Sequence, residues 1–212
     1  MGFMNAIGVD ANGSVGGLWV GWRKEARISH VMSCNNFIIL LVEKCNGLLW
    51  YLVLFYGAPS PSMRNSILED LESCIDSFQY PFLIMGDFNQ VEYASDKLSR
   101  NTGTISGTLD FNNWRISNEL VDNPFKGPRF TWCNNRKVDK RVYERIDRAL
   151  GSKDWFTIFP NTGIKQDPIQ ISDHAPIELY LNLTWNVSKK SYKIDAWVFS
   201  HEECLHCNTP RY

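Results

Sequence analysis

The sequence lacks a hydrophobic run long enough to cross a membrane, a secretory signal and an excess of charge of either sign. Its longest apolar stretch, Leu48–Phe55, is far shorter than the ~20 residues that span a bilayer. No basic-then-apolar segment opens the chain, so we expect a soluble intracellular protein, nuclear or cytoplasmic, and not a secreted one. The 22 Lys and Arg residues balance 23 Asp and Glu residues, so only a local basic patch could attract nucleic acid.

A disulfide framework is also lacking, because the six cysteines are scattered along the chain without dense spacing. We expect them to be reduced thiols. Near the C-terminus four potential metal ligands lie close together, namely His201, Cys204, His206 and Cys207. Structural zinc sites use two ligand pairs separated by a finger or loop, so this crowding argues against zinc.

Side chains that form a core are plentiful, with 44% hydrophobic and 13% aromatic residues over 212 positions. A chain of this length and composition forms one globular domain that buries roughly 70% of its extended surface. The sequence turns polar after Leu183. We therefore expect a domain over residues 1–185 and a C-terminal appendage over residues 186–212.

The hydrophobic pattern predicts an α/β fold. Two apolar runs, Phe37–Val42 and Leu48–Tyr56, flank an Asn-Gly turn and predict a β-hairpin buried on both faces. Because this hairpin and the late strands need antiparallel partners, two mixed β-sheets flanked by helices fit better than a doubly wound parallel sheet. The pattern also predicts helices over 63–78 and Leu109–Leu120, a strand over Phe82–Met85 that ends in Gly86, strands over Arg129–Cys133, Tyr143–Leu150 and Ile177–Leu183, and a helical turn around Ser152–Phe156.

The strongest local signal for chemistry is Gly86-Asp87-Phe88-Asn89, directly after a buried strand. In an extended segment Asp87 and Asn89 point to one side while Phe88 turns into the core. The carboxylate could accept a proton or hold a hard cation, and the amide could donate to a phosphoryl oxygen. An Asx turn that only closes the strand has about equal weight.

Two further segments carry candidate groups. Ser172-Asp173-His174 precedes a predicted strand and could place an imidazole and a carboxylate on one phosphate, although a histidine that only satisfies a turn is the commoner case. In the predicted strand Tyr143–Leu150, Asp147 shares a face with Arg145 and Tyr143. On this segment alone we favour an ion-paired surface strand.

Basic residues cluster between positions 129 and 148, where seven cations outnumber three acids. Aromatic residues are interleaved with them, which is typical of a surface that binds phosphates and bases. A solvated charged hairpin is an equally weighted alternative. The residues we expect to bind nucleic acid are Arg129, Trp132, Arg136, Lys137, Lys140, Arg141 and Arg145.

Taken in order, Gly86–Asn89, Arg145–Asp147 and Ser172–His174 resemble the successive motifs of the endonuclease/exonuclease/phosphatase family, the metal-dependent phosphodiesterases that include apurinic-site endonucleases and the DNase I type. The resemblance covers positions from about 8 to about 200. Finer features look like the endonuclease domain of plant LINE-type (non-LTR) retrotransposons: Gly16–Leu18 before Trp22, Phe55–Pro59, Phe130–Trp132, Arg145–Leu150 and, after the domain, Tyr192–Trp197.

The resemblance implies a four-layer α/β sandwich of the DNase I type, with a cleft at the edge of its two sheets. It implies that Asp87 orients or deprotonates the attacking water, while Asn89 and Tyr56 bind the phosphate. His174 would contact the scissile phosphate, and Asp147 would fix the tautomer of His174. Asp173 and Asp87 would serve a metal ion, Mg²⁺ or Mn²⁺, during in-line attack of water on a DNA phosphodiester.

The start of the chain departs from the family pattern. The family begins with a strand that bears a catalytic Asn and continues to a Glu that binds the metal, whereas the only acid between Met1 and Lys24 is Asp10. We therefore expect the first strands and half of the metal site to be missing, and the metal to be weakly held. We also expect the chain to be part of a longer polyprotein with a reverse-transcriptase region.

Three functions follow from these observations. The first is a DNA endonuclease that nicks a duplex target, and the second is a catalytically inactive fragment derived from a retroelement. The third is a phosphatase or phosphodiesterase of the same fold with a substrate other than nucleic acid. The details of Phe130–Trp132 and Arg145–Leu150 argue against the third.

Overall fold

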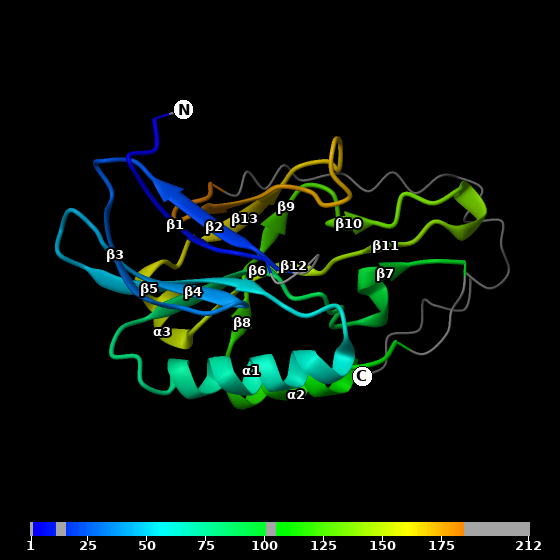
Figure 1. The fold of residues 1–212 in the computed structure, drawn as a ribbon, viewed down its shortest axis with the longest axis horizontal. Coiled ribbons are helices and arrows are strands. Elements are labelled where there is room, and N and C mark those ends of the chain that lie inside the picture. The colour runs from blue at the N-terminus through cyan, green and yellow to red at the C-terminus, as the bar shows by residue number, and fades with distance from the viewer. Residues whose placement is uncertain (1, 12–15, 101–104, 185–212) are drawn as a thin grey trace, which may run out of the picture.

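A computed structural model describes residues 2–11, 16–100 and 105–184 (Figure 1). The expected appendage over 186–212, with His201, Cys204, His206 and Cys207, lies outside the described residues. The four described cysteines, Cys34, Cys45, Cys74 and Cys133, are free thiols. No helix within the described ranges is long and apolar enough to cross a membrane.

A six-stranded mixed sheet forms the centre of the molecule. Its order is β3 (Arg27–Ser33), β4 (Phe37–Glu43), β5 (Leu49–Tyr56), β6 (Phe82–Asp87), β12 (Asp147–Gly151) and β8 (Val121–Asp122). Only the β5–β6 pair is parallel, and β4 and β5 form the predicted hairpin. The turn between them contains Gly47, whose φ of 78° lies in the left-handed region that glycine adopts without strain.

Two helices cover one face of this main sheet, below it in Figure 1. Helix α1 (Pro61–Ile75) links β5 to β6, and α2 (Thr108–Ser117) lies beside it. The helix begins before and ends before the predicted range 63–78, because Pro61 occupies the first turn, where proline is favoured, and the last helical residue is Ile75. The apolar faces of both helices and the main sheet enclose one core, which includes Leu71, Ile84, Phe88 and Phe111.

A smaller sheet covers the other face of the main sheet. It consists of β14 (Ile177–Tyr180), β13 (Gly163–Gln166) and β9 (Phe125–Lys126), with β13 parallel to β9. A second core lies between the sheets and includes Trp50, Leu83, Trp155 and Ile164. Helix α3 (Lys153–Ile158) contributes Trp155, and the hairpin of β1 (Asn5–Val9) and β2 (Leu18–Trp22) lies on the same side of the main sheet (Figure 1).

A third, short sheet projects beside the carboxyl end of β6. It pairs β10 (Trp132–Cys133), β11 (Tyr143–Glu144) and β7 (Lys97–Leu98), and the turns η1 (Ala94–Asp96) and η2 (Val138–Lys140) flank it. The predicted α/β fold with two mixed sheets and helices outside is confirmed. The described residues supply three of the four expected layers: α1 with α2, the main sheet and the smaller sheet.

The prediction of one strand over Tyr143–Leu150 was wrong. The segment divides into β11 and β12, which belong to different sheets, with Arg145 and Ile146 between them. The chain leaves the β ladder here because the hydroxyl of Thr131 accepts hydrogen bonds from the backbone N–H groups of Ile146 and Asp147, at 3.1 and 3.0 Å. Tyr143 and Asp147 therefore do not share a strand face.

Candidate active site

Three polar residues form a row across adjacent strands of the main sheet. Tyr56 ends β5 and lies in register with Asp87, which ends β6, and Asp87 lies in register with Asp147 at the start of β12. Side chains of residues in register point to the same face of a sheet. The topology therefore gathers these residues from positions far apart in the sequence.

Asp87 and Asn89 form a tight turn at the end of β6. The backbone N–H of Asn89 donates to Asp87 Oδ1 at 2.7 Å, and Asn89 Nδ2 donates to Asp87 Oδ2 at 3.0 Å and to the carbonyl of Gly57 at 2.7 Å. Asn89 has a φ of 50°, so the segment is not extended as predicted, but Phe88 is buried as expected. The Asx turn that the sequence allowed is present, and it brings the carboxylate and the amide together, while their role in chemistry stays a prediction.

The Asp87 carboxyl has an unusual affinity for protons. Burial raises its pKa to about 7, and the nearby charge of Asp147 acts in the same direction. The Asn89 N–H, His174 and Arg64 oppose this rise. A carboxyl with this pKa can exchange a proton near neutral pH, which is the property required of a general base or acid.

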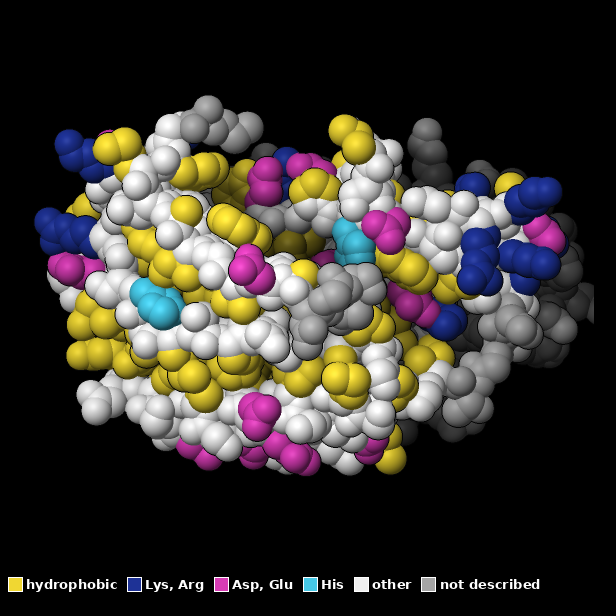
Figure 2. Space-filling view, in the orientation of Figure 1, with side chains coloured by type: hydrophobic (Ala, Val, Ile, Leu, Met, Phe, Trp, Pro, Cys, Tyr) yellow, Lys and Arg dark blue, Asp and Glu magenta, His cyan; other side chains and the backbone are white. Residues whose placement is uncertain are grey.

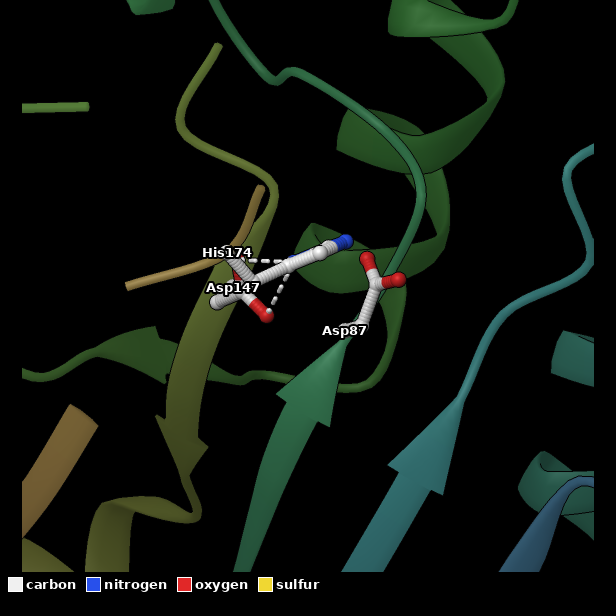
Figure 3. A group of neighbouring side chains, drawn as sticks. All are labelled: Asp87, Asp147 and His174. Atoms are coloured by element: carbon white, nitrogen blue, oxygen red, sulfur yellow. Dashed lines mark hydrogen bonds and ion pairs between the residues drawn. The ribbon is translucent and has the colours of Figure 1, made fainter. Parts of the chain in front are cut away.

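His174 lies between the two carboxylates (Figure 3). Its Nδ1 is 3.1 and 3.3 Å from the carboxylate oxygens of Asp147, and its other ring nitrogen points toward Asp87. The hydrogen bond with Asp147 is the main cause that raises the pKa of His174, although burial lowers it. The imidazole is therefore oriented by one carboxylate and biased toward its protonated form.

The donor set of this cluster suits a hard divalent cation. Ligand atoms of Asp87, Asp147 and His174 lie within 4.8 Å of one another. Two carboxylates can supply oxygen ligands to Mg²⁺ or Mn²⁺, and Mg²⁺ keeps several of its waters when few carboxylates are available. The residues present thus fit such an ion with few protein ligands.

Two other predicted site residues lie beside the cluster rather than in it. Tyr56 lines a surface hollow of about 430 Å³. Among the described residues, the phenol hydroxyl of Tyr56 has no hydrogen-bond partner. Asp173 is exposed, and its carboxylate accepts a hydrogen bond from Trp132 Nε1 at 3.1 Å, which lowers the pKa of Asp173. His174 and its loop line another hollow of about 390 Å³.

The prediction that Arg145 binds nucleic acid was wrong. Its side chain is buried, pairs with both carboxylate oxygens of Asp122 at 2.7 and 3.2 Å, and lies over the ring of Phe125. Arg148 is buried as well and pairs with Glu92 and other acids. A buried cation needs such partners because desolvation is costly, so these two arginines belong to the interior.

The remaining basic residues form an exposed group at one end of the molecule. Arg136, Lys137 and Arg141 flank η2, and Lys140 is its last residue. Figure 2 shows Lys and Arg side chains gathered at this end, on the face that also exposes histidine. Arg129 is exposed too, and Trp132 is half-buried beside Asp173. We refer to residues 136–141 as the basic tip.

Sequence reasoning gave no role to two buried residues that support the site. Thr131 is fully buried and fixes the backbone of Asp147 through its hydroxyl, and Arg64 is buried behind the Asp87–Asn89 turn. Arg64 precedes the apolar residues Ile67 and Leu68 by three and four positions. That spacing places it on the buried face of α1 and is the signal that could have identified it.

Comparison with known proteins gives a consistent result. A model of the endonuclease/exonuclease/phosphatase family matches residues 2–174. The chain is similar to the endonuclease domain of TRAS1, a telomere-specific non-LTR retrotransposon, at 16% identity over 85% of this chain and 81% of that one, with a TM-score of 0.66. It is also similar to the 3′-5′ exonuclease NExo from Neisseria meningitidis, at 15% identity over 84% and 80%, with a TM-score of 0.61. Curated protein sequences give no match.

Proposed function

The chain belongs to the endonuclease/exonuclease/phosphatase family, and on this basis we propose that it is a metal-dependent phosphodiesterase of the retrotransposon endonuclease type, which nicks DNA. The observation that carries the proposal is the cluster of Asp87, Asp147 and His174 at the ends of β6 and β12. The cluster combines a carboxyl that titrates near pH 7, an imidazole oriented by a second carboxylate, and oxygen ligands for a hard cation.

Each residue has a role that follows from its contacts. Asp87 orients the attacking water and takes its proton, since burial places the pKa of this carboxyl at about 7 in the metal-free protein. Protonated His174 donates a hydrogen bond to a phosphoryl oxygen from the ring nitrogen that points toward Asp87, and Asp147 holds the ring in that orientation. Asn89 holds the carboxylate of Asp87 through two hydrogen bonds.

The metal would be held by Asp87 and Asp147, and we propose Mg²⁺ or Mn²⁺. When bound, such an ion neutralises charge that develops on the phosphoryl group. Tyr56 and Asp173 remain proposed contributors, to phosphate binding and to the metal or leaving oxygen, from their places beside the cluster. Because only two carboxylates belong to the cluster, we propose that the ion is weakly bound.

Duplex DNA is the substrate that the surface charge favours. The basic tip presents four exposed cations on the face that also exposes histidine, and cations of this kind bind phosphates regardless of sequence. One similar structure is an endonuclease domain of a non-LTR retrotransposon, and another is described as NExo bound to a product DNA hairpin. We therefore propose that the substrate is DNA rather than a small phosphate ester.

The proposal is tested by incubating the purified chain with supercoiled plasmid in Mg²⁺ or Mn²⁺. We expect nicking that EDTA abolishes, and Asp87→Asn and His174→Ala should each reduce the rate by at least ~10²-fold, as loss of an acid–base group does. Asp70→Asn, an exposed carboxylate on α1, is the matched control and should keep the wild-type rate.

Two outcomes would favour the alternative functions. Folded protein without nicking, and without hydrolysis of bis(p-nitrophenyl) phosphate, would identify an inactive fragment derived from a retroelement. Hydrolysis of the small ester without nicking, and without salt-dependent binding to duplex DNA, would identify a phosphodiesterase with a substrate other than nucleic acid.

A further inference from the structure

Arg64 is a cation at a position where the helical pattern calls for an apolar side chain. It lies in the first turns of α1 and shares the buried face with Ile67, Leu68 and Leu71. Only 8% of its surface is exposed. The buried position is therefore part of how this helix packs against the main sheet.

Three physical effects make this position unfavourable for a cation. Burial removes its hydration, and the N-terminal end of a helix carries a partial positive charge. Within the described ranges, no ion pair joins Arg64 to a carboxylate, in contrast with the buried Arg145 and Arg148. The groups that Arg64 binds are therefore the best explanation for a buried cation at this position.

The guanidinium of Arg64 contacts two separate loops. Nη1 donates to the carbonyl oxygens of Ala58 and Pro59, at 3.2 and 2.9 Å, in the loop after β5. Nη2 donates to Gln90 Oε1 at 2.7 Å, in the loop after β6. Gln90 is buried and donates in turn to the carbonyls of Val91 and Ser106.

These two loops carry the candidate active site. The N–H of Gly57 donates to the carbonyl of Asp87 at 2.7 Å, and Asn89 Nδ2 donates to the carbonyl of Gly57 at 2.7 Å. Arg64 binds the residues directly after Gly57 and directly after Asn89. Arg64 thus completes a network of hydrogen bonds that links the two loops at the end of the parallel pair β5–β6.

We propose that Arg64 is a positioning residue: its guanidinium ties the loop after β5 to the loop after β6 and so holds Asp87 and Asn89 in their working geometry. The inference rests on the proposed function for its catalytic meaning, but the positioning itself is a property of the fold. The planar guanidinium is required because one group must reach oxygens on both sides, which a lysine ammonium does less well.

The test compares amide hydrogen exchange by NMR in wild-type protein and Arg64→Ala. We expect the N–H groups of Gly57 and Asn89 to exchange about tenfold faster in the variant, whereas the N–H of Val53 in the middle of β5 stays protected. Guanidinium ions at non-denaturing concentration should restore part of the protection, because they can occupy the space that the side chain leaves. Arg64→Lys should show an intermediate effect and serves if the alanine variant does not fold.

Arg115 provides the matched control. It is a largely buried arginine on α2 that binds Glu92, the carbonyl of Leu120 and Asn112. Glu92 belongs to the loop after β6, but within the described ranges no hydrogen bond of Arg115 reaches the loop after β5, so Arg115 does not tie the two loops together. Arg115→Ala should leave exchange at Gly57 and Asn89 unchanged. Unchanged exchange in Arg64→Ala, or equal acceleration in both variants, would overturn the proposal whether or not the protein nicks DNA.

Activity gives a second readout where nicking is observed. Arg64→Ala should lower kcat by ten- to a hundredfold with little change in KM for plasmid, because a misplaced reactive group costs rate more than binding. Guanidinium should recover part of kcat in this variant alone. If the wild-type protein does not nick DNA, the proposed function fails while the exchange measurement still decides the role of Arg64.

Discussion

At the scale of single residues, the site is built at the expense of stability. Asp87 is buried near Asp147, so the folded protein binds its proton more tightly than an unfolded chain does. The pKa of Asp is ~3.9 in unfolded chains. Stability from this group is therefore greatest below that value, falls as the pH rises to about 7, and stays constant above it.

The direction of this pH dependence gives the first prediction. In buffer with EDTA, Asp87→Asn should raise the free energy of unfolding by about 2 kcal/mol or more at pH 8, because a neutral amide avoids the cost of a buried charge. The gain should shrink steadily between pH 7 and pH 4. Urea denaturation across this range measures it, with Asp70→Asn on the exposed face of α1 as the control. A gain that does not depend on pH would contradict the assignment.

The second prediction concerns His174. Its hydrogen bond with Asp147 is the largest cause that raises its pKa, and the charge of Asp173 is the smallest. Asp147→Asn should therefore lower the pKa of His174 clearly, and Asp173→Asn should lower it only slightly. An NMR titration of the imidazole protons measures both, and equal effects of the two substitutions would show that the hydrogen bond is not the cause.

The same shift determines how this pair contributes to stability. A histidine whose pKa is raised by folding stabilises the protein fully below its unfolded value of ~6.5, and the contribution is lost as the pH rises through the folded value. Asp147→Asn should consequently cost more stability at pH 5.5 than at pH 8.5. Asp87 and His174 thus respond to acid in the same direction, since both bind protons more tightly in the folded protein.

At the scale of elements, a close approach of two strands fixes the geometry under Asp87. Gly86 has a φ of 149°, and a Cβ atom at this position would lie 2.0 Å from the carbonyl oxygen of Phe55 on β5. Neither strand can move without disturbing the register that aligns Tyr56 with Asp87. Glycine is therefore required where β6 passes β5.

The third prediction compares two glycines. Gly86→Ala should lower the free energy of unfolding by about 3 kcal/mol or more, because it adds a backbone clash to a strained φ. Gly47→Ala also has a positive φ but meets open space, so it should cost only about 1 kcal/mol. Urea midpoints give both values. Similar losses would mean that backbone conformation alone, without the strand contact, sets the cost.

Elements that are long and periodic could be predicted from the sequence, and short ones could not. The β4–β5 hairpin and α1 are long enough for their own residues to show the hydrophobic pattern of a strand or a helix. β10 and β11 are two residues long and exist because tertiary contacts hold them, as the hydroxyl of Thr131 does at the break before β12. No periodicity in Tyr143–Leu150 marks that break.

At the scale of the whole molecule, the site combines segments separated by up to 87 positions, from Asp87 to His174. Each motif has an ordinary structural interpretation in isolation, so only their joint resemblance to a family predicted that they would meet. The cluster of basic residues in the sequence did not indicate which of its side chains are exposed. Arg145 belongs to the same cluster as the basic tip but is buried against Asp122. Burial depends on the three-dimensional fold, which a local run of charges does not reveal.

The fold also separates charge on a chain that is nearly neutral overall. The basic tip lies at one end of the molecule, whereas the exposed acids Glu69 and Asp70 lie on α1 (Figure 2). A DNA backbone is attracted by the first surface and repelled by the second. The charge distribution therefore favours one orientation of the proposed DNA substrate.

The fourth prediction tests this orientation through salt dependence. Each phosphate contact contributes about −0.9 to the slope of log affinity against log salt on duplex DNA. The double variant Lys137→Gln with Lys140→Gln should bind more weakly and show a slope smaller in magnitude by up to about 2. Arg23→Gln with Lys24→Gln removes the same charge from the exposed turn between β2 and β3, at the opposite end of Figure 1, and should keep the wild-type slope. Fluorescence anisotropy with a labelled duplex measures both; equal changes would show that net charge, rather than the placement of the basic tip, governs binding.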